Sequence, residues 1–265
     1  MKIFEILKCC SDIKKEGKTI FSNYYNKYNN SKNDFDVITG EGTIIFGIKE
    51  EFIYRIYFYS NNLPALKKCL EKVRKKAVTD WIFKDEIGEI SRVIEKSGWK
   101  KYAEYARTMQ PIPNKRKKTK MELLLEKMYN PNLAQLAIEN DIPAIRKLLF
   151  DTFDPINSEI MTEDELRKLI QEETVWLHKV NNEITTCYIY RIEGKKRYGA
   201  LTYNCLSADY LYSVTKKANE ISNIKYDLKW HYGWINIENK KVIRSLKQTG
   251  ELNLDGVRNV IFQKR

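Results

Sequence analysis

From residue 132 onward, apolar residues recur first at helical spacing and then in alternation. The sequence Asp141-Ile142-Pro143 is typical of a helix start, with proline in the first turn. Thr162 and Glu165 have the spacing of a capping box that begins a second helix. The apolar faces of these helices consist of Ile145, Leu148, Leu149, Phe153, Leu166, Leu169 and Ile170. We therefore predict two amphipathic helices after a short apolar stretch at 133–138.

Three runs rich in apolar, β-branched and aromatic residues follow these helices. They cover 175–180, 184–191 and 198–206, and the turn signals Asn181-Asn182 and Glu193-Gly194 separate them. This spacing predicts a three-stranded antiparallel meander with helices on both of its faces.

The remainder of this half alternates between helix and strand. A helix that begins at Ser207 is followed by a strand-like run at 226–234. A second helix at 238–249 ends at Gly250, and the residues 257–263 predict a last strand.

The first half of the chain contains a shortened version of the same order. Its predicted elements are a strand at 54–59, a helix at 63–76, a strand at 78–83, a helix at 85–97 and an aromatic stretch at 99–109. Before them, 4–28 has a helical pattern and 43–48 has a strand pattern. An internal duplication would produce this repeat, but the same order is common in unrelated α/β proteins, so both explanations stay open.

The net charge of +12 is unevenly distributed over the 265 residues. Residues 1–121 hold 26 basic and 15 acidic residues (+11), whereas 122–265 hold 21 and 20 (+1). Five cations follow two prolines, Pro111 and Pro113, and these cations are Lys115, Arg116, Lys117, Lys118 and Lys120. Such a run is typical of a solvated linker, and it favours either contact with a polyanion or solubility alone.

Length and hydrophobic content indicate how many domains the chain can form. With 43% hydrophobic residues the chain can bury a core, and its length fits one large or two small domains. We predict a domain at 1–110, a basic linker with a connecting helix at 111–131, and a second domain at 132–265.

Several classes of protein and site are disfavoured. No apolar run approaches the roughly 18 residues of a membrane helix, and the first residues lack the apolar segment of a secretory signal, so we expect a cytoplasmic protein with no membrane contact. The five cysteines have no C-x-x-C spacing and only two histidines are present, so we expect neither a disulfide framework nor a metal site. Cys9, Cys10 and Cys205 could act as nucleophiles, but no catalytic-cysteine signature accompanies them, which favours packed thiols.

Two short motifs accompany this order of elements. Asp141-Ile142-Pro143-Ala144-Ile145 enters the first helix, and Asn239, Val242, Ile243 and Gly250 mark the last helix. Together they resemble the GNAT superfamily of acyl-coenzyme A N-acyltransferases. The resemblance implies an α/β (α+β) fold with two lobes, each a mixed, mostly antiparallel sheet flanked by helices. It also implies transfer of an acyl group, such as acetyl, from an acyl-coenzyme A to an amine on a small molecule or peptide.

The resemblance also implies where acetyl-coenzyme A, or another acyl-coenzyme A, would bind. In the family, a glycine-rich turn after the fourth strand donates backbone N–H groups to the pyrophosphate. Here that turn reads Asn204-Cys205-Leu206-Ser207-Ala208, without spaced glycines, and we expect the amides of Leu206, Ser207 and Ala208 to donate instead. Asn239 occupies the family's asparagine position, where it would either help to hold the co-substrate or cap the last helix.

The catalytic candidates follow from a missing residue. The family often uses a tyrosine four residues before the terminal glycine as the general acid, and this position is Leu246 here. The remaining candidates are Tyr203, Tyr232 and His231, because tyrosine can donate a proton and histidine can remove one from an amine. Each of them can equally be a packed structural residue, His231 above all, because it stands in an aromatic strand.

Two other functions fit the same features. The missing glycine turn and tyrosine are compatible with a catalytically inactive relative that only binds a ligand. The basic first half, with its aromatic strands, is compatible with a relative that uses aminoacyl-tRNA or another RNA.

Overall fold

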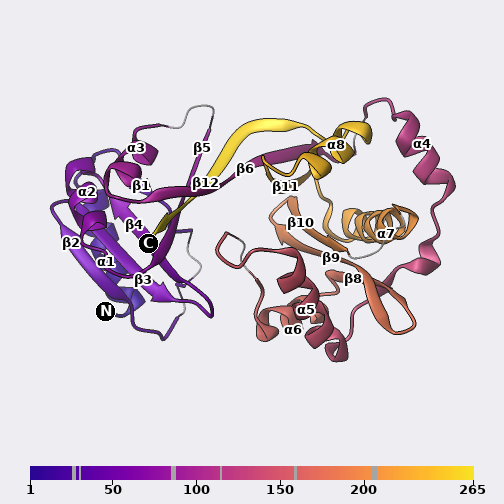
Figure 1. Cartoon of the computed structure of the whole chain (residues 1–265), viewed down its shortest axis with the longest axis horizontal. Helices are drawn as coiled ribbons and strands as arrows, with labels where there is room; N and C mark the ends of the chain where they lie inside the picture. The colour runs from indigo at the N-terminus through magenta and orange to yellow at the C-terminus, as the bar shows by residue number, and fades with distance from the viewer. Residues whose placement is uncertain (26–27, 30, 85–87, 114, 158–159, 204–207) are drawn as a thin grey trace. The chain divides into compact units, whose positions relative to one another are not determined.

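The structure is a computed structural model that describes residues 1–25, 28–29, 31–84, 88–113, 115–157, 160–203 and 208–265 (Figure 1). It consists of two compact units. Unit 1 contains Met1–Tyr105 together with Gly256–Arg265, and unit 2 contains Ala106–Asp255. The domain boundaries at 1–110, 111–131 and 132–265 stay a prediction.

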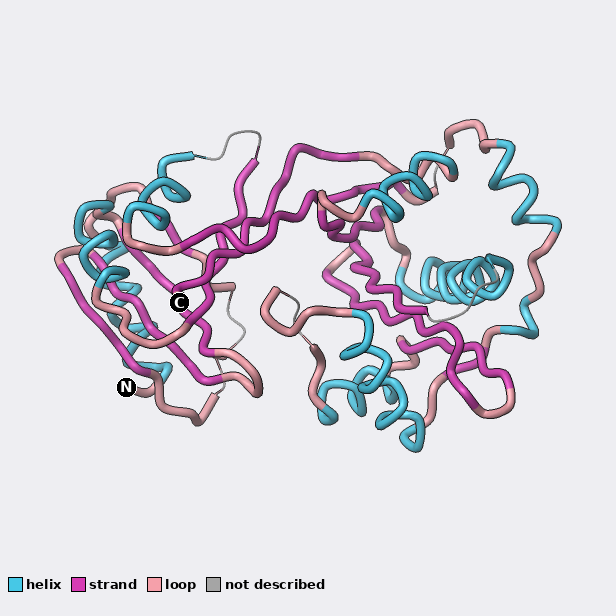
Figure 2. The backbone as a smooth tube through the Cα atoms, viewed as in Figure 1, coloured by secondary structure: helices cyan, strands magenta, loops and turns pink. Residues whose placement is uncertain are grey.

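Unit 2 contains the expected antiparallel meander. Its strands are β8 (Val175–Val180), β9 (Glu183–Glu193) and β10 (Lys196–Tyr203). Helices α5 (Ile142–Thr152) and α6 (Glu163–Gln171) lie on one face, and α7 (Ala208–Tyr226) lies on the other (Figure 2). The mixed α/β fold with a mostly antiparallel sheet between helices is thereby confirmed.

The alternation of side chains along these strands explains the two faces. Val175 and Leu177 on β8 pack with the α5 and α6 side chains, whereas Trp176 between them packs with Val214 and Ala218 of α7. Successive strand residues point to opposite faces of a sheet, so a strand that is apolar at every position needs a helix on both sides.

Local signals set most helix starts in unit 2. The Thr162 hydroxyl accepts from the backbone N–H of Glu165, and the Glu165 carboxylate accepts from the N–H of Thr162, which is the predicted capping box. In the short apolar stretch at 133–138, strand β7 comprises only Gln135–Leu136. Strand β11 (Trp230–Asn236) starts later than the predicted 226–234, because α7 runs to Tyr226.

Unit 1 repeats the meander with its own helices. In chain order its elements are α1 (Ile3–Lys15), β1 (Phe21–Ser22), β2 (Asp36–Gly40), β3 (Thr43–Lys49), β4 (Tyr54–Ser60), α2 (Leu63–Glu71), β5 (Ala77–Lys84) and α3 (Gly88–Lys96). Ile44 and Phe46 face α1, whereas Ile45 faces α2 and α3. The prediction of one helix over 4–28 is wrong: α1 ends at Lys15, and Gly17 then takes a positive φ of 71°.

The remaining strands and α-helices of the described chain are β6 (Lys100–Pro111), α4 (Lys120–Lys127), α8 (Lys240–Gln248) and the last strand, β12 (Leu254–Lys264). Two short 3-10 helices, Pro131–Leu133 and Glu139–Asp141, precede α5. Strand β12 pairs antiparallel with β5, from Val257 opposite Lys84 to Lys264 opposite Ala77. The strand order β5-β12-β6-β11 places β6 next to β11. The last strand of the sequence therefore completes the sheet of unit 1, and the end of β6 lies beside β11 in unit 2.

Candidate functional site

Strands β10 and β11 of unit 2 are parallel, but they pair only at their beginnings. The paired residues are Lys196 with Trp230, Arg197 with His231 and Tyr198 with Tyr232. Both strands continue, β10 to Tyr203 and β11 to Asn236, but beyond these three pairs they do not pair with each other among the described residues. Helix α7 is the next described element after β10 along the chain, and it begins at Ala208. Like any helix start, it has backbone N–H groups without a partner inside the helix.

His231 lies where the two strands part, and a buried arginine holds it. Its Nδ1 accepts a hydrogen bond from Arg197 Nε at 3.3 Å. Burial, and then the positive charge of Arg197, lower the pKa of His231 to about 3. The imidazole is therefore neutral at physiological pH, and this environment favours a structural role over the predicted role as a base.

Arg197, on strand β10, also forms hydrogen bonds with α7. Its side chain is 3% exposed, and Nη1 donates to Ser222 Oγ and to Asn223 Oδ1, each at 2.7 Å. Within the described ranges no carboxylate pairs with Arg197, so the base of the opening contains a buried positive charge that is solvated by neutral groups.

The two tyrosine candidates have different surroundings. The Tyr232 hydroxyl donates to Glu193 Oε2 at 2.5 Å, and its ring stacks on Tyr198 with centroids 5.1 Å apart. Burial, followed by this carboxylate, raises the pKa of Tyr232, so its phenol stays protonated at neutral pH. Tyr203 is the last residue of β10, and its side chain is outside the described part of the structure.

Of the four residues predicted to bind the co-substrate, the structure describes two, Ala208 and Asn239. Leu206 and Ser207 lie outside the described residues, and Ala208 is the first residue of α7. Asn239 is the N-cap of α8, where its Oδ1 accepts from the N–H of Val242 at 3.2 Å. This hydrogen bond supports the interpretation of Asn239 as a helix cap.

One residue that the sequence did not single out is Glu251, which follows Gly250. Solvent reaches this side chain, yet desolvation by the surrounding protein raises its pKa, and Thr249 and Arg116 offset the rise only in part. Its charge also adds to the burial that raises the pKa values of Tyr188 and Tyr212 to about 12. Tyr188 is on β9 and Tyr212 is on α7, so the charge of Glu251 acts on both of these elements.

The basic run contains two cations that are already paired. Arg116 binds both carboxylate oxygens of Glu122, at 2.5 and 2.7 Å, and donates to the carbonyl of Thr249. Its guanidinium also lies against Gly250, where an added Cβ would be 2.8 Å from Nη1. Lys118 pairs with Glu126 at 2.5 Å. Of the predicted polyanion contacts, Lys115, Lys117 and Lys120 form no ion pair with the described residues.

Three further features bear on the chemistry. In the described part of the chain, no three His, Cys, Asp or Glu side chains gather as a metal site would require. Cys10, Cys69 and Cys187 are buried, Cys9 is half-buried, and none of these four described cysteines forms a disulfide; Cys205 lies outside the described residues. None of the described helices is long and apolar enough to cross a membrane.

Comparisons with known proteins give structural neighbours only. No protein-family model and no curated sequence matches this chain significantly. A GCN5-related N-acetyltransferase from Sphaerobacter thermophilus is 9% identical over 84% of this chain and 76% of its own, with a TM-score of 0.57. A GCN5-related N-acetyltransferase from Kribbella flavida is 9% identical over 87% and 89%, with a TM-score of 0.53. A tandem GNAT protein from the clavulanic acid biosynthesis pathway is 8% identical over 86% and 81%, with a TM-score of 0.50.

At such low identities the likeness concerns the fold. It agrees with the element order and with the meander between two layers of helices. This chain therefore has the fold of the GNAT superfamily of N-acetyltransferases.

Proposed function

We propose that unit 2 transfers an acyl group, such as acetyl, from an acyl-coenzyme A to the amine of a small molecule or peptide. The observation that carries this proposal is the opening between β10 and β11, which stop pairing with each other after Tyr198 and Tyr232; α7 is the next described helix along the chain. An opening of this kind can admit the extended pantetheine arm of acyl-coenzyme A. The amides of Leu206, Ser207 and Ala208 would then donate to its pyrophosphate, because a helix N-terminus favours negative charge.

The reaction would proceed by direct attack. The neutral amine nitrogen attacks the thioester carbonyl carbon, the carbon–sulfur bond breaks, and the departing thiolate takes up a proton while the amine loses one. Glu251 is a candidate for removal of the amine proton, because desolvation raises the pKa of its carboxylate and its charge acts on Tyr188 and Tyr212. Tyr203, at the free end of β10, is the acid candidate, because the Tyr232 hydroxyl already donates to Glu193.

Calorimetric titration with acetyl-coenzyme A and with a longer acyl-coenzyme A tests this site. Replacing Ala208 with proline removes one amide donor at a position where a helix tolerates proline, so we expect binding to weaken about tenfold. The matched control is Ala208→Gly, which retains the amide and should bind like the wild type. If Ala208→Pro binds acyl-coenzyme A unchanged, the assigned site is wrong.

A non-catalytic binding role is the second candidate, favoured by the neutral, arginine-bound His231 and by the absence of glycines in the turn at 204–208. Saturable acyl-coenzyme A binding without thiol release over a panel of amines would indicate this role. An RNA-using role would instead show polyanion binding that falls steeply with salt.

A further inference from the structure

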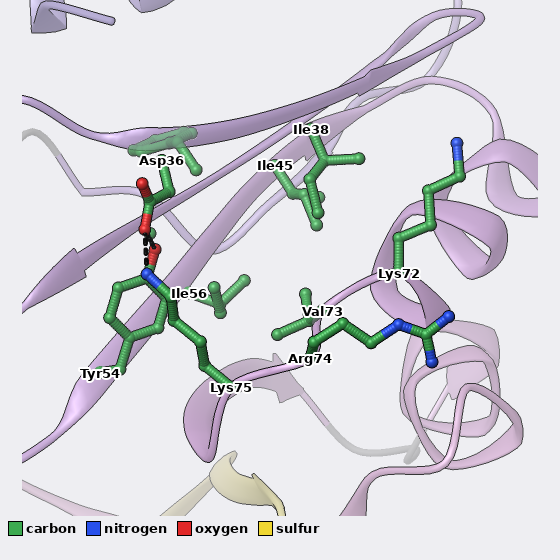
Figure 3. Close-up of a pocket in the computed structure, with 11 residues that line it drawn as sticks. Asp36, Ile38, Ile45, Tyr54, Ile56, Lys72, Val73, Arg74 and Lys75 are labelled. Carbon is green, nitrogen blue, oxygen red and sulfur yellow. Dashed lines mark hydrogen bonds and ion pairs between the residues drawn. The ribbon is translucent and has the colours of Figure 1, made fainter.

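Unit 1 contains a cavity of about 250 Å³ at the carboxyl end of α2 (Figure 3). Its apolar wall is formed by Ile38, Ile45, Ile56 and Val73, which also belong to the core beneath α2. The loop that joins α2 to β5 closes one side. The cavity lies at the opposite end of α2 from its N-cap Asn62, so it is separate from the helix start that the family resemblance associates with coenzyme A.

The lining of this cavity contains more positive than negative charges. Asp36 is the acidic residue of the lining, and it is already neutralised: Lys75 Nζ lies 2.6 Å from its Oδ2, and the Tyr54 hydroxyl donates to the same oxygen at 2.5 Å. The Lys75 ammonium also lies 4.6 Å from the centre of the Tyr54 ring. Asp36 and Lys75 therefore add no net charge to the wall.

Lys72 and Arg74 supply the uncompensated charge. Figure 3 shows their side chains on the side of the apolar group away from Asp36. Both residues are exposed, and neither forms an ion pair among the residues that the structure describes. The positive charge of Arg74 also acts on a neighbouring cation. The pKa of Lys264 is lowered first by desolvation and then by this charge.

We propose that this cavity binds a small amphipathic carboxylate, with its apolar part against Ile38, Ile45, Ile56 and Val73 and its carboxylate on Arg74 and Lys72. An arginine fork can bind both oxygens of a carboxylate, and the Lys72 ammonium on the same side of the cavity adds a second positive charge. A volume of about 250 Å³ is slightly below the usual range of ligand pockets, which favours a medium-chain or single-ring acid over a nucleotide. This site is independent of the acyl transfer proposed for unit 2.

Calorimetric titration of the full chain with octanoate tests the site, and acetate and 1-octanol separate its two contributions. We expect saturable binding of octanoate. Acetate lacks the apolar chain and 1-octanol lacks the charge, so each should bind at least about tenfold more weakly. An absence of saturable octanoate binding overturns the proposal, as does equal binding of 1-octanol.

Variants locate the binding. Arg74→Gln and Lys72→Gln should each weaken octanoate binding about tenfold, since each removes one charge-assisted contact. Lys76→Gln is the matched control: Lys76 is an exposed cation of the same loop that does not line the cavity, and its loss should leave affinity unchanged. Equal weakening by Lys76→Gln would show non-specific attraction and overturn the assigned site.

Discussion

Each unit places a buried arginine where its parallel strand pair begins, but the two arginines are compensated differently. In unit 1, Arg55 lies opposite Val78, is 9% exposed, and pairs with Glu50 Oε2 at 3.0 Å. In unit 2, Arg197 lies opposite His231, and its partners are an imidazole, a hydroxyl and amide oxygens. The same strand position thus holds a closed ion pair in one unit and a buried cation without a carboxylate in the other.

This difference shows which unit is suited to anions at its strand opening. An ion pair has little residual field, whereas a cation with neutral partners keeps a positive potential in its surroundings. The positive potential of unit 2 lies at the base of the opening between β10 and β11, where it would favour an anionic ligand. In unit 1 the uncompensated cations, Lys72 and Arg74, lie at the other end of α2.

The largest expected effect concerns the last strand, which completes unit 1. Phe262 is fully buried in the core of that unit, so Phe262→Ala should lower the free energy of unfolding of unit 1 by about 3–5 kcal/mol. Native-state hydrogen exchange would assign the loss by comparing the amides of β4 with those of β9. Phe4→Ala, at a side chain that is 68% exposed, is the control. A loss confined to unit 2 would contradict the assignment of β12 to unit 1.

The two arginines should respond differently to the same change. Arg55→Met removes the cation from Glu50, whose side chain is 19% exposed, and should destabilise unit 1 by about 3 kcal/mol. Arg197→Met leaves only neutral groups behind and should destabilise unit 2 less, by about 1–2 kcal/mol. It should also raise the pKa of His231, because it removes the nearby charge.

Urea denaturation measures the two losses, and NMR titration of the His231 ring measures the pKa change. An equal cost for both variants would indicate that charge compensation does not distinguish the units. An unchanged His231 pKa in Arg197→Met would contradict the contact between Arg197 and the imidazole.

Acidification should affect unit 2 first. The pKa of His231 is about 3 in the folded state and about 6.5 in the unfolded state, so the unfolded state binds more protons between these values. This contribution to stability is complete above pH 6.5 and is lost as pH falls toward 3, by at most about 1.4 kcal/mol per pH unit.

Both histidines of the chain lie in unit 2, so unit 1 lacks a histidine contribution in this window. Chemical denaturation at pH 7 and pH 5 measures the difference, and His231→Gln should reduce it. A pH dependence that is identical in His231→Gln would assign the effect to other groups.

The smallest expected effect concerns two helix caps. Asn62 accepts from the N–H of Ala65 at 3.1 Å in unit 1, and Asn239 accepts from Val242 at 3.2 Å in unit 2. Replacing either with alanine should cost about 1 kcal/mol in its own unit. If Asn239→Ala also weakens acyl-coenzyme A binding while Asn62→Ala does not, Asn239 contacts the co-substrate as well.

The sequence alone determined the order of elements and most of their positions. The meander over β8, β9 and β10, the start of α6 at Thr162 and the end of α8 before Gly250 all depend on residues within a few positions of one another. Such signals act through backbone conformation and short hydrogen bonds, so they can be read locally. The error at 4–28 was local too, because Gly17 already indicated a helix end.

Only the tertiary structure decided which strands and side chains meet. Val260 of β12 lies opposite Trp81 of β5, and Arg197 meets His231, although each pair is far apart along the chain. The apolar pattern of β12 would suit any strand neighbour, so its partner follows from the packing of the whole sheet. The same holds for Glu251 and for the cavity beside Arg74: their chemistry depends on desolvation and on the balance of nearby charges, and both depend on the folded surroundings rather than on neighbours in the sequence.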